Sequence, residues 1–319
     1  MPHLRPLGRS GLSTPPLVLG GNVFGWTASG EEAFRILDRF VAAGGRMIDT
    51  ADVYSAWVPG HKGGESESLI GEWLRRRGAK GEVLIATKVG MLPGEGGEKL
   101  EPARIAAAAE ASLRRLGVEE IDLYYAHQED PKTPVEESLT AFDRLVREGK
   151  VRALGASNYK PENLRRALDF SDAQGIARYE VLQPEYHLMG RDTFEGELQQ
   201  LCLEREVGVL PYYGLASGFL TGKYRSPADQ KQSVRGDRMG KFLNARGYAV
   251  LAALDDLAGE TGTNPSTVAL AWLAAQPGVT APIASARTPT QLEDFIGALE
   301  LELSREQIAR LDEASRTPL

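Results

Sequence analysis

The chain has 319 residues, of which 42% are hydrophobic and 25% charged, an ordinary balance for a globular protein with enough length to bury a large core. Its formal net charge of -7 provides no basic surface for nucleic acid or an anionic membrane, so we expect neither as a partner. The single cysteine, Cys202, excludes an intrachain disulfide framework and suits a reducing compartment, which makes a cytoplasmic location the expectation.

The N-terminal segment is polar and broken by turn residues. It lacks the apolar core of a signal peptide, and no uninterrupted apolar run reaches the ~18 residues of a membrane span. Within "LRPLGRSGLST", Gly8 and Gly11 flank a turn between two short apolar pieces. This pattern predicts a β-hairpin, which could close the bottom of a barrel.

One unit recurs along the rest of the chain: a short apolar run, a loop, and a longer segment of helical periodicity. The eight apolar runs are 16–21, 46–50, 83–88, 121–127, 151–158, 179–186, 208–213 and 280–285. The helical candidates between them include 31–44, 65–78, 102–117 and 133–150, several with an acidic start and a basic end followed by Gly. Eight such units predict an α/β fold, a (β/α)8 TIM barrel with extra helical segments, and the alternative is a doubly wound open sheet.

The last two apolar runs are separated by an unusually long segment. Residues 214–244 form a Gly-, Lys- and Arg-rich stretch, and a helical segment follows it. Long loops in compact domains are more often functional than idle, although disorder is the plain alternative. We therefore expect one barrel domain over residues 1–319, with 214–244 as a functional loop.

Nucleotide and metal motifs are missing. No GxGxxG follows any of the runs, and "GLASGFLTGKY" lacks the earlier Gly and the Ser/Thr of a P-loop. The four histidines show no spacing typical of a metal site, so no metal is predicted.

Polar side chains stand at the ends of three neighbouring runs. Asp49 ends the second run, Lys88 the third and His127 the fourth, while Tyr54 follows Asp49 in "IDTADVY". Each has a plain alternative: a helix cap for Asp49, solvated strand ends for Lys88 and His127, rim packing for Tyr54. In a (β/α)8 barrel, however, the carboxyl ends of all strands open onto one face, where these four side chains would meet.

The four side chains together suit proton transfer to an oxygen. An ammonium at Lys88 would lower the pKa of the Tyr54 phenol, and the Asp49 carboxylate would keep that lysine charged in a partly desolvated pocket. His127 can donate a hydrogen bond to a carbonyl oxygen and orient it toward Tyr54. Because none of these groups is a redox centre, the electrons must come from a cofactor.

The sequence resembles the aldo-keto reductases over essentially its whole length. The resemblance lies in "GGNVFG", "IDTADVY", "GGESESLIGEWL", "ATKVG", "YYAHQED", "GKVRALGASNY", "LQPEYHLM", "PYYGLASGFLTGKY" and "PIASARTPTQLED". It implies a (β/α)8 oxidoreductase that binds an extended NAD(P)H without a Rossmann fold. It also implies the family's catalytic tetrad at Asp49, Tyr54, Lys88 and His127, with Tyr54 as proton donor.

The same resemblance implies the cofactor residues. Ser157, Asn158 and Gln183 match positions that bind the nicotinamide carboxamide, and Tyr212 matches the aromatic residue that stacks on the ring. Ser217, Gly218 and Lys223 match the pyrophosphate loop, so 214–244 is expected to cover the cofactor. The complete implied set is Gly21, Asn22, Asp49, Ser157, Asn158, Gln183, Tyr212, Tyr213, Gly214, Leu215, Ser217, Gly218, Lys223, Ser285, Arg287, Gln291 and Asp294.

Two departures from the family pattern affect this set. The family usually has Tyr-Ser-Pro-Leu where this chain has Tyr212, Tyr213, Gly214 and Leu215, which changes the start of the pyrophosphate loop. Asp294 and Phe295 stand where relatives commonly have Glu-Asn, so the adenine contacts must differ. Ser285, Arg287 and Gln291 match the 2′-phosphate positions, and the planar donor fork of Arg287 favours NADPH over NADH.

The substrate and the class of function are less defined. Phe24, Trp26, Trp57 and Met91 could form an apolar pocket beside Tyr54 for an aldehyde or ketone. A cofactor-sensing binding protein resembling the potassium-channel β subunits remains an alternative. A lyase with Lys88 as Schiff-base nucleophile is a third class, but a carboxylate partner at Asp49 argues against it.

Overall fold

The computed structural model describes residues 3–78, 81–232 and 236–316. Within these residues the strands form two sheets, one of two antiparallel strands and one of eight parallel strands. The strands are β1 (Arg5–Pro6), β2 (Ser13–Thr14), β3 (Val18–Gly20), β4 (Met47–Asp49), β5 (Leu84–Val89), β6 (Ile121–Ala126), β7 (Val151–Ser157), β8 (Tyr179–Gln183), β9 (Gly208–Val209) and β10 (Ile283–Ala284). The parallel strands follow the order β10-β3-β4-β5-β6-β7-β8-β9.

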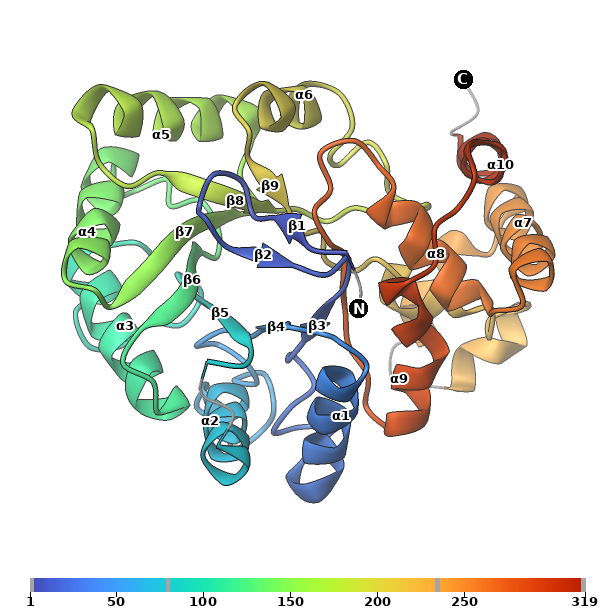
Figure 1. The fold of residues 1–319 in the computed structure, drawn as a ribbon, viewed down its shortest axis with the longest axis horizontal. Coiled ribbons are helices and arrows are strands. Elements are labelled where there is room, and N and C mark those ends of the chain that lie inside the picture. Colours follow the sequence, from blue (N-terminus) through green and yellow to red (C-terminus); the bar gives the residue numbers. More distant parts are fainter. Residues whose placement is uncertain (1–2, 79–80, 233–235, 317–319) are drawn as a thin grey trace.

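The parallel sheet curls, and backbone hydrogen bonds join its two ends. The amide of Thr280 donates to the carbonyl of Val209 at 2.8 Å, and the amide of Ile283 donates to that of Pro211 at 2.8 Å. Figure 1 shows the helices around the outside of this sheet. The arrangement is an α/β fold consistent with the expected (β/α)8 barrel, and the doubly wound order is wrong because the strands run consecutively around the sheet.

Helices connect the strands. They are α1 (Gly30–Ala42), α2 (Glu65–Arg77), α3 (Pro102–Leu116), α4 (Val135–Arg147), α5 (Pro161–Gln174), α6 (Glu197–Glu204), α7 (Ala245–Thr261), α8 (Pro265–Ala274), α9 (Pro289–Ile296) and α10 (Arg305–Ser315). The C-cap of α3 is Gly117 and that of α5 is Gly175, both with positive φ, as helix ends favour. The helices α7 and α10 lie against each other outside the ring of alternating strands and helices, and are the extra helical segments that the sequence predicts.

The N-terminal hairpin plugs one end of the sheet, as predicted. Leu7 and Leu12 of the hairpin belong to an inner core with residues of every parallel strand or its immediate flank, including Met47 and Leu123. Figure 1 shows β1 and β2 across the centre of the curled sheet. One glycine is needed inside this core, because a Cβ on Gly155 would lie 2.4 Å from the ring of Tyr125. A larger outer core lies between the sheet and the helices.

The segment after β9 is more ordered than a plain loop. In the described part of 214–244 the chain forms three 3₁₀ helices, η1 (Ala216–Thr221), η2 (Pro227–Gln232) and η3 (Gly236–Phe242). Residues 233–235 of the expected loop lie outside the described residues. A fourth 3₁₀ turn, η4 (Gly297–Leu299), follows α9.

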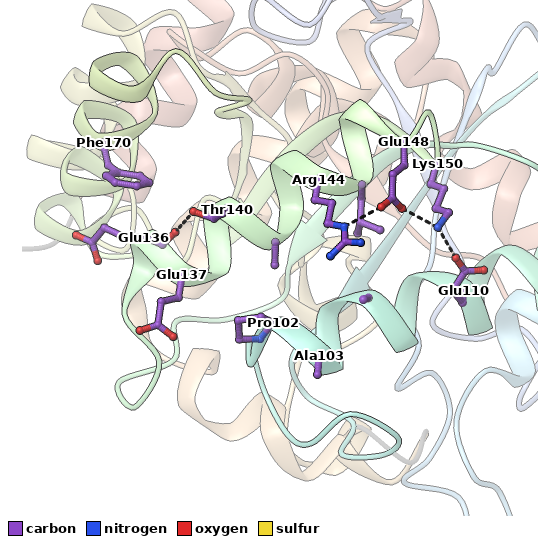
Figure 2. A pocket seen from close by; sticks show the side chains of 13 residues that line it. Pro102, Ala103, Glu110, Glu136, Glu137, Thr140, Arg144, Glu148, Lys150 and Phe170 are labelled. Atoms are coloured by element: carbon purple, nitrogen blue, oxygen red, sulfur yellow. Dashed lines mark hydrogen bonds and ion pairs between the residues drawn. The ribbon is translucent and has the colours of Figure 1, made fainter.

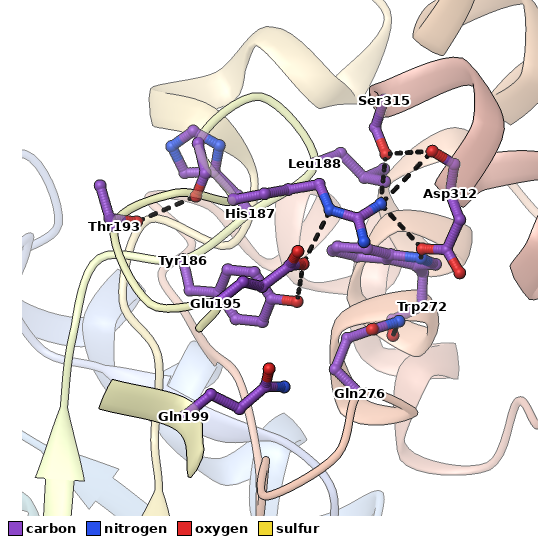
Figure 3. Close-up of polar contacts among 12 residues, drawn as sticks. Tyr186, His187, Leu188, Thr193, Glu195, Gln199, Trp272, Gln276, Asp312 and Ser315 are labelled. Carbon is purple, nitrogen blue, oxygen red and sulfur yellow. Dashed lines mark hydrogen bonds and ion pairs between the residues drawn. The ribbon is translucent and has the colours of Figure 1, made fainter. Parts of the chain in front are cut away.

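A network of polar contacts fastens α10 to the rest of the fold. The guanidinium of Arg191 donates to Asp312 Oδ1 at 2.8 Å and to Glu195 Oε1 at 2.7 Å, and lies 5.3 Å from the ring centre of Trp272. The indole of Trp272 also donates to Asp312, and Figure 3 shows that ring beside the carboxylate of Asp312. One ionic group thus joins three parts of the fold, which are α8, α10 and the loop that follows β8.

Candidate active site

The four residues that the sequence places in the tetrad meet at the carboxyl ends of neighbouring strands. Asp49 is the last residue of β4, Lys88 the fifth residue of the six-residue β5, and His127 follows β6 directly. Tyr54 lies in the loop after β4. Parallel pairing of β4, β5 and β6 places these ends side by side, which is why residues distant in sequence form one cluster.

Lys88 and Asp49 form a buried ion pair. Lys88 Nζ lies 2.6 Å from Asp49 Oδ2, and the two side chains are 0% and 3% exposed. The ammonium also donates to the carbonyl of Thr50 at 2.7 Å. Burial disfavours the charge of Lys88, but Asp49 and Tyr54 outweigh it and raise the pKa of the ammonium. A lysine held protonated is a poor nucleophile, so the geometry argues against the Schiff-base alternative.

Lys88 joins Tyr54 to this pair. Its ammonium donates to the Tyr54 hydroxyl at 3.3 Å and lies 4.9 Å from the centre of the phenol ring. The oxygen of Tyr54 therefore stands beside a cation that would stabilise negative charge on it.

The pKa of Tyr54 departs from the sequence expectation. Burial raises the pKa of the phenol above its ordinary value of 10.0, and Lys88 lowers it without overcoming that effect. The expected lowering by Lys88 is present, but the expected net depression is wrong for the protein by itself, because desolvation of the phenolate is the larger effect. Tyr54 thus holds its proton at neutral pH.

His127 is a neutral imidazole facing the same space. Its pKa is held well below the ordinary 6.5, first by burial and then by the nearby charge of Lys88. The rings of His127 and Tyr54 are 6.0 Å apart between centroids. His127 Nδ1 is buried and has no partner in the described structure. A neutral imidazole with an unsatisfied ring nitrogen can bind a polar atom of a ligand.

The four residues expected at the nicotinamide carboxamide and ring form a connected set. Asn158 Nδ2 donates to Ser157 Oγ at 3.1 Å, and the Tyr212 hydroxyl donates to Asn158 Oδ1 at 2.7 Å. Gln183 Nε2 donates to Asp49 Oδ1 at 2.9 Å, which links this set to the Lys88 pair. The strand ends of β7, β8 and β9 therefore bring this group next to the tetrad.

The expected pyrophosphate residues lie in and around η1. Ser217 and Gly218 have positive φ of 57° and 103°, and a Cβ on Gly218 would lie 3.6 Å from Lys223 Nζ. Gly214 is buried, because its Cα faces Leu270 and Leu273 of α8, while the neighbouring Tyr213 is exposed. A turn with consecutive left-handed residues next to an exposed ammonium is a suitable site for an anion.

The residues expected around the adenosine end follow β10 and β3. Ser285 Oγ donates to Asn22 Oδ1 at 2.7 Å, and the amide of Gly21 donates to the carbonyl of Asp49 at 2.6 Å. Gln291 Oε1 accepts from the amide of Arg287 at 3.0 Å. The guanidinium of Arg287 has no ion pair within the described residues. Asp294 is exposed in α9, whereas Phe295 is 2% exposed in the outer core.

The expected substrate residues divide into two groups. Trp57 is 49% exposed and stacks edge-on against both Tyr54 and Trp26, at ring-centroid distances of 5.7 Å and 5.8 Å. Met91 is 41% exposed. Phe24 is fully buried in the outer core, so its expected place in the pocket is wrong. The loop after β3 turns the Phe24 ring inward, beside Gly21.

The sequence patterns did not indicate some of the residues at this site. The carbonyl of Thr50 binds Lys88, and the ring centre of Tyr125 lies 5.8 Å from its ammonium. Asp52, between Asp49 and Tyr54, is fully buried and pairs with Arg104 of α3. The second acid in "IDTADVY" was a visible signal for Asp52, whereas no sequence pattern marked Arg104.

A separate groove lies on the outside of the fold. Its volume is about 690 Å³, and it lies between α3, α4 and α5. Figure 2 shows Pro102 and Ala103 on one side, Phe170 at one end, and Glu110, Glu148 and Lys150 paired at the other. None of the expected catalytic or cofactor residues lines it.

Comparisons with known proteins give one consistent result. Residues 16–316 match the model of the Aldo/keto reductase family. The chain is 34% identical to "Aldo-keto reductase str7" of Strobilurus tenacellus, over 92% of this chain and 85% of that protein. It is 31% identical to "L-glyceraldehyde 3-phosphate reductase" of Escherichia coli K12, over 97% and 91%. It is 29% identical to "Aldo-keto reductase yakc [NADP(+)]" of Schizosaccharomyces pombe, over 90% and 83%.

Proposed function

The chain belongs to the aldo/keto reductase family, and we propose that it reduces an aldehyde or ketone with NADPH, taking the proton from Tyr54. Reduction of carbonyl groups agrees with relatives named as reductases. One relative carries NADP(+) in its name. The proposal adds three points to the family assignment: NADPH as the cofactor, Tyr54 as the proton donor, and an apolar group on the substrate.

One observation supports the proton donor most directly: the continuous contact from Asp49 through Lys88 to the Tyr54 hydroxyl. The raised pKa of Tyr54 keeps the proton available for donation. After the proton has left, the phenolate stands 3.3 Å from an ammonium that Asp49 holds in its charged form. The pair therefore stabilises the charge that proton transfer creates on Tyr54, more than it stabilises the neutral phenol.

His127 orients the carbonyl group in this proposal. Because its imidazole is neutral, one ring nitrogen donates a hydrogen bond and the other accepts one. A hydrogen bond from His127 to the substrate oxygen holds that oxygen beside Tyr54. Trp57 and Trp26 provide the apolar wall next to it, which favours a carbonyl compound with an apolar or aromatic group.

The donors at the strand ends fit an anionic dinucleotide. Ser157, Asn158 and Gln183 offer amide and hydroxyl groups for a carboxamide, and Tyr212 an aromatic face. Ser217, Gly218 and Lys223 surround a site for phosphate oxygens, and Arg287 has a guanidinium without an ion pair in the described chain. When bound, the reduced nicotinamide would supply the hydride for the carbonyl carbon.

The substitution Tyr54→Phe tests the proposal. We expect the variant to bind NADPH with unchanged affinity and to lose carbonyl reduction by roughly two or more orders of magnitude, the usual weight of general acid catalysis. The measurement is loss of nicotinamide absorbance across a panel of aldehydes and ketones, with NADPH and NADH in parallel, and cofactor binding by fluorescence titration.

Tyr248→Phe is a matched control, since it removes the hydroxyl of an exposed tyrosine in α7 that belongs to none of the expected catalytic, cofactor or substrate residues. It should leave reduction within a few-fold of wild type. Near-normal turnover in Tyr54→Phe would refute the donor assignment. A wild-type protein that binds NADPH but reduces no carbonyl would favour the cofactor-sensing alternative.

We further propose that 1–319 is one domain in the cytoplasm whose 214–244 segment covers the cofactor. Lys223 lies in this segment beside Gly218, where the phosphate groups are expected. Limited proteolysis tests this arrangement: saturating NADPH should slow cleavage within 214–244 and leave cleavage elsewhere unchanged.

A further inference from the structure

A cluster of four charged side chains lies behind the loop that carries Tyr54. Asp52 pairs with Arg104 at 3.2 Å, with 0% and 7% of the side chains exposed, and Glu67 pairs with Arg115 at 2.6 Å, with 0% and 26% exposed. Glu67 also accepts a hydrogen bond from Thr87, the residue before Lys88. The cluster thus lies between the outer side of β5 and the helices α2 and α3.

Arg104 ties two loops of the active-site face together. Its Nη2 donates to Asp52 in the loop after β4, and its Nε donates to the carbonyl of Leu92 at 3.0 Å, in the loop after β5. Its Nη1 also donates to the carbonyl of Glu95 at 3.3 Å. One guanidinium therefore satisfies acceptors on both loops, as its fixed fork of donors allows.

The two loops also touch each other directly. A Cβ on Gly63, whose φ is +92°, would lie 2.7 Å from Leu92 Cδ2 and 2.7 Å from the carbonyl oxygen of Asp52. Gly63 belongs to the same β4–α2 loop as Tyr54. The two loops are therefore in close contact, and the distance between them depends on what holds Leu92 in place.

Asp52 connects this support to the catalytic groups. It lies two residues before Tyr54, and its amide donates to the carbonyl of Lys88 at 3.2 Å. A shift of Asp52 thus moves the backbone that positions both the phenol and the ammonium. Asp52 Oδ1 has no hydrogen-bond partner in the described structure, so the side chain is supported on one oxygen only.

The buried carboxylate of Asp52 depends on the positive charge of Arg104. Burial and the negative charge of Glu67 raise the pKa of Asp52 to about 7, against the opposing charges of Arg104 and Arg115. Tyr124 of β6 also faces this group, with a hydroxyl that has no hydrogen-bond partner in the described structure. Without Arg104 the carboxylate would be buried beside another carboxylate, and the loop would have to move or take up a proton.

We propose that Arg104 is a positioning residue for the reaction: by holding Asp52 and the Leu92–Glu95 turn together, it sets the distance between the Tyr54 hydroxyl and Lys88. This inference rests on the proposed function, because it concerns the geometry of the same proton donor. Arg104 acts through Asp52, and within the described residues it forms no hydrogen bond or ion pair with the four tetrad side chains.

The test is Arg104→Met, which keeps an unbranched apolar side chain but removes every donor. We expect kcat for carbonyl reduction to fall by about tenfold or more, since a displacement on the order of 1 Å at a reacting group can cost up to ~100-fold. The dissociation constant of NADPH should stay within about twofold. Rates are measured per folded, cofactor-binding molecule, well below the melting temperature, so a loss of stability alone does not change them.

Three further variants complete the design. Arg104→Lys retains a cation and some donors, so its kcat should lie between those of wild type and Arg104→Met. Asp52→Asn combined with Arg104→Met removes the unpaired carboxylate and should restore stability but not kcat. Arg114→Met is the matched control, because Arg114 is exposed on the same helix α3 and has no ion pair within the described chain.

The outcomes separate the two proposals. A wild-type protein inactive on every carbonyl would overturn the proposed function and, with it, this inference. An active wild type with a folded Arg104→Met of kcat within twofold would overturn the positioning role alone. If Arg104→Met does not fold, the double variant and Arg104→Lys decide, and wild-type kcat in both would overturn the inference.

Discussion

Lys88 is the residue on which the proposed chemistry depends most. Its ammonium contacts Asp49, the Thr50 carbonyl and the Tyr54 hydroxyl, all within 3.3 Å, and it is completely buried. A cation in such a position has a strong effect on both neighbours, whereas an exposed ion pair would contribute ~1 kcal/mol or less. Lys88 therefore affects both the stability and the reaction of the protein.

We predict that Lys88→Met lowers carbonyl reduction by two or more orders of magnitude and destabilises the fold by roughly 3–5 kcal/mol, the cost of leaving a buried charge unpaired. The pKa of Tyr54 should rise further, because the ammonium that lowers it is gone. Adding Asp49→Asn should recover stability but not activity. Kinetics with saturating NADPH and urea denaturation measure the two effects.

The pH dependence gives a second test of the same pair. Reduction requires protonated Tyr54, and burial raises its pKa, so the wild-type rate should be lost only as pH rises above the ordinary tyrosine value of ~10. A basic limb well below that value would contradict the assignment. Lys132→Met, at an exposed ammonium, serves as control and should follow the wild-type profile.

Asp52 should make stability depend on pH. Its pKa is raised from 3.8 to about 7, so the folded protein retains a proton that the unfolded chain releases between these values. The free energy of unfolding therefore decreases through Asp52 as pH rises from about 4 to about 7, and this contribution is constant above. The variant Asp52→Asn has no carboxyl group at this position, so this pH dependence should be absent from it. As pH rises through that window, the free energy of unfolding of this variant should increase relative to wild type by on the order of a few kcal/mol, since one pKa unit is worth about 1.4 kcal/mol.

Denaturation in urea at a series of pH values measures this difference, and the slope against pH is the informative quantity. The offset between the two proteins also includes the changed contact with Arg104. Parallel stability curves for the two proteins would mean that Asp52 is ionised throughout.

At the scale of elements, the prolines explain why three strands are shorter than the apolar runs. The run 179–186 contains Pro184, and β8 ends at Gln183. The run 208–213 contains Pro211, and β9 ends at Val209. The run 280–285 contains Pro282, and β10 begins at Ile283. Proline has no amide hydrogen, so it interrupts the ladder where an apolar run by itself would continue.

The attachment of α10 is the clearest element-scale prediction. Arg191 bonds Asp312 and Ser315 of this helix, at 2.8 Å and 2.9 Å, and Glu195 of its own loop. Arg191→Met should lower the free energy of unfolding by roughly 1.5–3 kcal/mol, the range for hydrogen bonds to a charged group. Amide exchange within α10 should increase more than exchange in β6. Chemical denaturation and hydrogen exchange measure these effects.

Arg166→Met is the matched control for this variant. Arg166 forms a bidentate pair with Glu136 at 2.7 Å and 3.0 Å, but its side chain is 61% exposed. Its removal should cost at most about 1 kcal/mol. Equal losses in the two variants would show that the α10 network has no special weight.

At the scale of the molecule, the sheet is unequal around its circumference. The strands β5, β6 and β7 have six, six and seven residues, whereas β9 and β10 have two each. The side where β9, β10 and β3 meet therefore has fewer ladder hydrogen bonds. Most of the proposed cofactor residues, among them Asn22, Tyr212 and Ser285, follow the strands of this weak side.

We predict that NADPH stabilises this side selectively. Without cofactor, the amides of 208–210, 280–281 and 283–285 should exchange faster than those of β6 and β7, because local opening is easier where the ladder is short. Saturating NADPH should slow exchange in 208–221 and 280–287 and leave β6 unchanged. At 100 times the dissociation constant the whole protein should gain about 2.7 kcal/mol. Uniform protection across all strands would contradict this picture.

The sequence by itself determined the repeating order of elements and the strand-end position of the expected catalytic residues. Alternation of apolar runs with helical periodicity reflects local preferences and burial, and these are encoded in consecutive residues. The fold class, the hairpin and the positions of Asp49, Lys88 and His127 at neighbouring strand ends followed from this pattern. Assignment of Tyr54 as proton donor needed the family resemblance, and it stays a proposal.

Only the tertiary structure decided the properties that depend on distant neighbours. Whether burial or Lys88 controls the pKa of Tyr54 depends on packing from several strands, and here burial is the larger effect. Phe24 turned into the core and Arg104 reached Asp52 across 52 positions in sequence, through contacts that no local pattern encodes. Desolvation and ion pairing are sums over all surrounding groups, so they become defined only when the chain has brought those groups together.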